Sequence, residues 1–80
     1  MTPTVHREGP FRFFFYSHES REPPHIHVQR EDRVAKFWLQ GPALAAPGGF
    51  PPRDIQRVMD IVRARRSEFL EAWHAHFSDP

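Results

Sequence analysis

The stretch "EPPHIHVQRE", from Glu22 to Glu31, decides how the fold of this chain is read. Its middle alternates polar and apolar side chains without interruption: His25, Ile26, His27, Val28 and Gln29. Successive side chains of a β-strand point to opposite faces, so this alternation predicts a strand with one apolar face and one face that carries both histidines. The double proline predicts a loop before that strand, because proline has no amide hydrogen for pairing.

Strand patterns also precede and follow this stretch. We predict strands near residues 4–8, 11–17, 25–30 and 33–39, separated by "GP", a polar loop and the charged turn "REDR". Pairing in sequence order then gives an antiparallel meander. Residues 40–51 are rich in proline, glycine and alanine, and we interpret them as a connection with room for a short helical turn at residues 43–46.

After residue 51 the hydrophobic period becomes helical. Apolar residues recur at spacings of three, four and seven: Ile55, Val58, Met59, Val62, Phe69, Trp73 and Phe77. Proline suits the first position of a helix, so we predict one helix from about residue 52 to residue 77. At roughly 1.5 Å per residue it would be about 39 Å long, about twice the length of a strand. It should therefore overhang the sheet, or bend or break near "RARRS", residues 63–67.

Together these elements predict a single α+β domain over residues 1–80, a four-stranded antiparallel meander with one long C-terminal helix packed on one face. The helix should cover the more apolar side, here called the helix face: Phe11, Phe13, Phe15, Ile26, Val28, Ala35, Phe37 and Leu39. The other side, here called the histidine face, collects Arg12, Phe14, Tyr16, His25, His27, Gln29, Lys36 and Trp38. In a small domain with one sheet we expect this second face to be open to solvent. We expect five residues to be buried against each other: Ile26, Val28, Phe37, Val62 and Trp73.

The composition limits the classes of function. A chain of 80 residues has room for one core. Its net charge of +1 neither favours nor excludes nucleic acid, so any electrostatic binding site must be local. The chain has no cysteine, and no apolar run approaches the roughly 18 residues of a membrane span, so we expect a cytoplasmic protein without membrane contact.

The histidine face has one structural explanation and three functional ones. Cross-strand aromatic pairs alone stabilise a sheet by roughly 0.2–1 kcal/mol each. The first functional option is a metal site, because "HIHVQRE" matches the H-x-H-x3-E spacing of cupin metal sites. Zinc needs three or four ligands, and the further candidates near the pair are His6, His18, Glu19 and Glu31. A cupin barrel needs about eight strands, which this chain cannot build. We therefore predict no bound metal and no cofactor.

The second option is metal-free acid–base chemistry. Histidine titrates near pH 6.5, so His25 and His27 can share the roles of acid and base at physiological pH. With Tyr16 positioning the substrate, they would form a small ribonuclease-like site, and these three are the candidate catalytic residues. The cations available to hold a phosphate are Arg21, Arg30 and Lys36. "HIHVQ" also resembles the histidine-triad nucleotidyl-transferase motif, but the rest of that fold is absent.

The third option is a binding surface for a partner protein or for single-stranded bases, which stack on aromatic side chains. The candidate binding residues are Phe14, His18, Lys36, Trp38 and Arg66. Arg66 is included because it interrupts the apolar stripe of the helix. Its stem either lies along the stripe and reaches water or a carboxylate, or its guanidinium points past the sheet edge towards the histidines.

A wider pattern resembles a known family. "FRFFFYSHESREPPHIHVQRED", then "AKFWL", a "GF-P-R" step and "RRSEFLEAWHAHF" are similar to the bacterial domain-of-unknown-function family numbered 4160. The resemblance covers nearly the whole chain, and only "GPALAAPGGFPP" departs from it. It implies a component of a two-protein, toxin–antitoxin-like module that acts on RNA or the translation machinery. The partner would be a protein encoded by the neighbouring gene, with RNA and a second copy of the chain as further candidates. The alternative is a non-enzymatic binding module.

Overall fold

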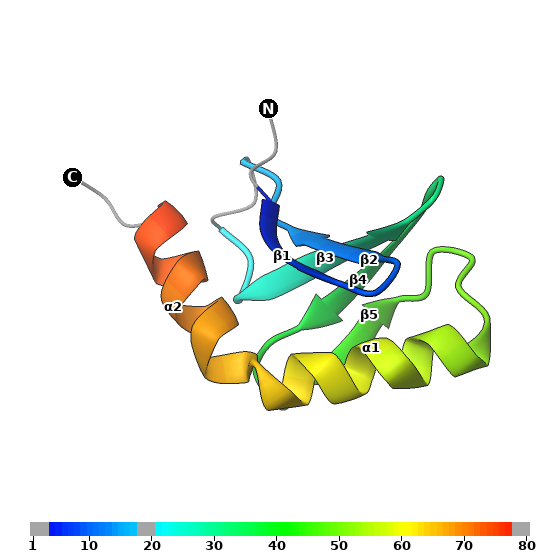
Figure 1. Cartoon of the computed structure of the whole chain (residues 1–80). Helices are drawn as coiled ribbons and strands as arrows, with labels where there is room; N and C mark the ends of the chain where they lie inside the picture. Colours follow the sequence, from blue (N-terminus) through cyan, green and yellow to red (C-terminus); the bar gives the residue numbers. More distant parts are fainter. Residues whose placement is uncertain (1–3, 18–20, 78–80) are drawn as a thin grey trace.

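The computed structural model describes residues 4–17 and 21–77 (Figure 1). It contains β1 (Thr4–Glu8), β2 (Phe11–Phe14), β3 (His25–Arg30), β4 (Arg33–Trp38), β5 (Ala43–Ala46), α1 (Pro52–Ala64) and α2 (Arg66–Phe77). The strands pair antiparallel in sequence order, from β1 at one edge to β5 at the other. The α+β class, the meander and the start of the helix at residue 52 are confirmed.

The sheet has five strands where four were predicted. Residues 43–46 form the edge strand β5 and not a helical turn, with Leu44 opposite Phe37 of β4. Gly41, with a φ of 111°, allows the chain to reverse after β4. Alanine is a poor strand former, but the unpaired backbone groups at the edge of β4 bind the returning chain and outweigh that propensity. Gly48 then lies so close to β4 that a Cβ there would be 1.8 Å from the carbonyl oxygen of Val34.

The predicted single helix is two helices that meet at Arg65. Its φ of −112° and ψ of 18° are not helical, although its N–H still donates to the Ile61 carbonyl at 2.9 Å. The 13 residues of α1 span about 20 Å, which matches the length of the longest strands. Figure 1 shows α1 running along the sheet and α2 turning away past its end. Of the predicted alternatives, an overhang, a bend or a break near residues 63–67, the structure has the break. A straight helix would leave its second half without a sheet to cover.

The core fills the space between the helix face and the two helices. Every residue of the helix face is buried. The helices contribute Val58, Val62, Phe69 and Trp73, and Phe50 adds a ring from the connection before α1. The five predicted core partners, Ile26, Val28, Phe37, Val62 and Trp73, all belong to this cluster. The assignment of the two sheet faces is thus confirmed for the apolar side.

Candidate functional site

Pairing between neighbouring strands assembles the centre of the histidine face. Phe14 of β2 lies opposite His27 of β3, and His27 lies opposite Lys36 of β4. One row further along, His25 pairs with Trp38. Phe14, His25, His27, Lys36 and Trp38, which were predicted to share this face, are therefore neighbours in the structure.

The expectation of an open face is wrong at its centre. His25 is 1% exposed, Phe14 is 3% exposed and His27 is 6% exposed. The Tyr16 ring covers His27 at a centroid distance of 4.4 Å, and Trp73 of α2 covers His25 at 4.9 Å. The face is covered because Trp73 of α2 reaches His25 at the end of the sheet and because Tyr16, two residues after β2, packs on His27 of β3.

The rim of the histidine face, formed by Tyr16, Glu22, Lys36 and Trp38, stays accessible. Tyr16 is 37% exposed, whereas Lys36 and Trp38 are half-buried. Lys36 forms an ion pair with Glu22, which lies in the connection between β2 and β3. This ion pair draws the end of the connection towards β4, across β3. Glu22 and Trp73 are parts of the site that the sequence reasoning missed, and no local pattern around either residue indicates its position here.

The double proline in "EPPHIHV" has a structural use. The carbonyl oxygen of Pro23 lies 2.9 Å from Nδ1 of His25. A carbonyl only accepts hydrogen bonds, so Nδ1 is the donor, and in the neutral ring Nε2 is the acceptor nitrogen. The carbonyl of Pro24 accepts the backbone N–H of Leu39 at 3.0 Å. Both carbonyls are thus paired, and neither proline leaves an amide hydrogen to satisfy.

Aromatic rings on this face already have cations and other rings against them. The Lys36 ammonium lies 4.6 Å from the centroid of Trp38, and the Arg12 guanidinium lies 4.6 Å from that of Phe14. Phe14 also stacks on His27 at 5.6 Å. Arg12 is held further by Gln29, whose Oε1 accepts its Nη1 at 2.9 Å. A base that stacked on Phe14 or Trp38 would have to displace these neighbours.

The metal hypothesis finds no complete ligand set among residues 4–17 and 21–77, where no three histidine, cysteine, aspartate or glutamate side chains cluster. The His25 and His27 rings lie 5.1 Å apart and nearly perpendicular. His6 packs instead on Phe13 and Phe69 of the core, and Glu31 lies in the turn after β3. His18 and Glu19 lie outside the described residues.

Arg66 and Arg30 lie away from the histidine face. Arg66 donates from Nε to the carbonyl oxygen of Leu39 at 2.7 Å, which fastens the start of α2 to the end of β4. Its interruption of the apolar stripe thus has a structural explanation. Arg30 alternates to the helix face and donates to Asp54 of α1.

Among the described helices, none is long and apolar enough to cross a membrane.

Comparison with known proteins gives one family and no characterised relative. Searches of curated proteins and of solved structures found no match. The model of a family described as "Domain of unknown function (DUF4160)" matches residues 11–74, which include β2 to β5, α1 and most of α2. The match contains the whole "PPHIHV" segment and the rim of the histidine face. This chain therefore belongs to the DUF4160 family.

Proposed function

We propose that this chain is the binding component of a two-protein, toxin–antitoxin-like module and that it docks a partner protein on the rim of its histidine face. The observation that carries this proposal is the burial of His25 and His27 beneath Tyr16 and Trp73. General acid–base catalysis needs an imidazole nitrogen within hydrogen-bond reach of the substrate. Histidines that are 1% and 6% exposed do not offer one. The geometry therefore favours binding over the ribonuclease-like reading.

The chemistry of the rim favours a protein over single-stranded bases. Stacking needs free ring faces, whereas Trp38 and Phe14 each have a cation against them. A protein partner needs only an apolar surface bordered by charge. Tyr16, Trp38, Lys36 and Glu22 provide two aromatic anchors, one cation and one carboxylate, and tyrosine and tryptophan are often hot spots of interfaces. The protein encoded by the neighbouring gene is the proposed partner.

The test is co-purification with the product of the neighbouring gene, followed by calorimetric titration. We expect Trp38→Ala to weaken binding by at least about 1 kcal/mol, or about fivefold in Kd, because the variant removes a hot-spot ring. Leu44→Ala is the matched control, since Leu44 is 39% exposed and pairs opposite Phe37, on the other side of the sheet. Equal affinities of the wild type and Trp38→Ala would refute the docking surface.

Substitutions of the two histidines separate binding from catalysis. The enzymatic reading predicts that His25→Ala or His27→Ala abolishes an activity while the fold and the partner are retained. The binding reading predicts no such activity. Expression of each gene alone and of both together, with growth as the readout, tests whether the two proteins act as a toxin and its antagonist.

A further inference from the structure

Arginines gather at the end of the sheet opposite α2. The β1–β2 turn, the β3–β4 turn and the start of α1 all lie at this end (Figure 1). We call residues 7–12, 29–33 and 51–57 the basic end. These segments hold six of the ten arginines of the chain: Arg7, Arg12, Arg30, Arg33, Arg53 and Arg57. They also hold four carboxylates, so the basic end has a net charge of +2 in a chain whose net charge is +1.

A partly buried ion pair and one aromatic ring organise this end. Nη1 of Arg30 donates to both carboxylate oxygens of Asp54, at 3.0 and 3.2 Å, and Asp54 is 6% exposed. The guanidinium of Arg30 also lies 5.8 Å from the centroid of Phe11, and that of Arg57 lies 5.4 Å from the same ring. Three elements, β2, β3 and α1, are therefore held in fixed relative positions.

Two hollows flank the β3–β4 turn. The first, of about 470 Å³, is lined by Arg30, Glu31, Arg33, Pro51, Pro52, Arg53 and Asp54. The second, of about 490 Å³, is lined by Thr4, Arg7, Pro10, Arg12, Gln29 and Glu31. Glu31 lines both, so the hollows adjoin at the turn. A ligand that occupied both would run from α1 past the hairpin to β1.

The cations along this path exceed the carboxylates that are free to pair with them. Arg7, Arg33 and Arg53 are exposed, and within the described part of the chain none of their guanidinium groups has a hydrogen bond or ion pair. Of the four carboxylates, Asp54 is bound by Arg30, and Glu8 is bound by Arg65 from outside the basic end. Only Glu31 and Asp32 remain, both in the turn itself.

The start of α1 adds further positive character to the first hollow. Pro52 has no amide hydrogen, so Arg53 carries the first backbone N–H of the helix. The positive end of the helix dipole therefore points into the same region as the Arg53 side chain. No side chain caps this end of the helix.

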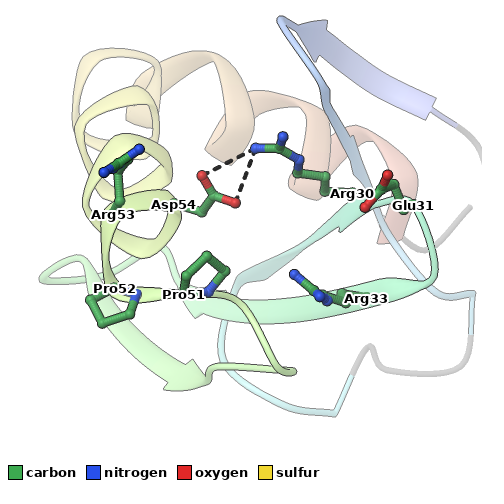
Figure 2. Close-up of a pocket in the computed structure, with 7 residues that line it drawn as sticks. All are labelled: Arg30, Glu31, Arg33, Pro51, Pro52, Arg53 and Asp54. Carbon is green, nitrogen blue, oxygen red and sulfur yellow. Dashed lines mark hydrogen bonds and ion pairs between the residues drawn. The ribbon is translucent and has the colours of Figure 1, made fainter.

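We propose that the basic end binds the phosphate backbone of a nucleic acid chain. Arginine forks match the geometry of phosphate oxygens. Figure 2 shows that the guanidiniums do not converge on one point: Arg30 and Arg33 extend from the hairpin, while Arg53 stands on the helix across the hollow. This arrangement suits a ligand with repeated phosphates better than a single free phosphate. The proposal goes beyond the docking function and is independent of it, because it uses other residues.

The test is fluorescence anisotropy with a labelled single-stranded RNA of about 20 nucleotides over a range of salt concentrations. For about three phosphate contacts, the slope of log K against log salt should be about −2, with a Kd of about 10⁻⁴ to 10⁻⁶ M at physiological salt. Arg33→Ala/Arg53→Ala should weaken binding about tenfold and reduce the slope by about 1.4, since two phosphate contacts are lost. Arg63→Glu is the control with the same change in net charge, at an exposed position outside the basic end.

The outcomes are distinct. RNA binding that the Arg33→Ala/Arg53→Ala variant loses and the control variant retains would support the proposal. No binding by the wild type, or equal weakening by the Arg33→Ala/Arg53→Ala variant and the control variant, would overturn it. Inorganic phosphate at matched ionic strength is the last arm. If it saturates the site as tightly as the RNA does, the ligand is a single phosphate and the backbone proposal fails. Trp38→Ala should leave RNA binding unchanged, so failure of the docking function is read separately.

Discussion

Truncation of two adjacent β4 residues tests the assignment of the sheet faces. Phe37 is fully buried in the core, whereas Trp38 is half-buried on the histidine face. Phe37→Ala should lower the free energy of unfolding by about 3–5 kcal/mol through lost burial and the cavity left behind. Trp38→Ala loses an edge contact with His25 at 5.7 Å and the Lys36 ammonium at 4.6 Å. These are worth about 0.5–1.5 and about 0.5–1 kcal/mol, so we expect a loss of about 1–2.5 kcal/mol.

Urea denaturation and thermal melts measure both variants. For a domain of this size, each kcal/mol shifts the Tm by about 4–8 °C, so the two variants should differ clearly. Equal m-values would show that the comparison is between stabilities and not between changed denatured states. If Trp38→Ala lowers the free energy of unfolding as much as Phe37→Ala does, then Trp38 belongs to the core of the protein, and docking on the rim of the histidine face is refuted.

Three further outcomes are expected. Elemental analysis of the purified protein should find no stoichiometric zinc, iron or nickel; about one metal per chain, lost in His25→Ala, would contradict this. A hydrogen bond from His6 and another from Arg65 lower the pKa of Glu8 below its ordinary value of 4.5. Its stabilising contribution is therefore present above about pH 4.5 and is lost as the pH falls through the folded-state pKa, so urea melts of Glu8→Gln should differ from wild type at pH 7 and agree with it at strongly acidic pH. Glu31 has a φ of 57°, a backbone conformation that costs little only for glycine. Glu31→Gly should therefore raise the free energy of unfolding by about 0.5–1 kcal/mol in the same assay. A lower free energy of unfolding would mean that the Glu31 side chain stabilises the turn.

The sequence alone determined which side chains share a face. Alternation along each strand is a local property of an extended chain, so it predicted that Phe14, His27 and Lys36 share one face before any packing was known. That these three lie opposite one another in a row follows from the register between strands, which only the structure shows. The helix period and Pro52 likewise predicted where α1 begins. The length mismatch predicted that the helical segment would overhang the sheet, bend or break.

Tertiary structure decided what covers each face and what pairs with each edge. No pattern in an alanine-rich segment predicts β5, because its strand conformation depends on the edge of β4 beside it. The burial of His25 depends on Trp73, which lies 48 positions later in the sequence. Trp73 reaches His25 only because the chain changes direction at Arg65, between α1 and α2. The basic end likewise forms only where the two turns and the start of α1 meet. The face to which a strand side chain points is thus set by its position in the local alternation of the chain. Its exposure and its electrostatic surroundings are set by the distant segments that the fold packs against it.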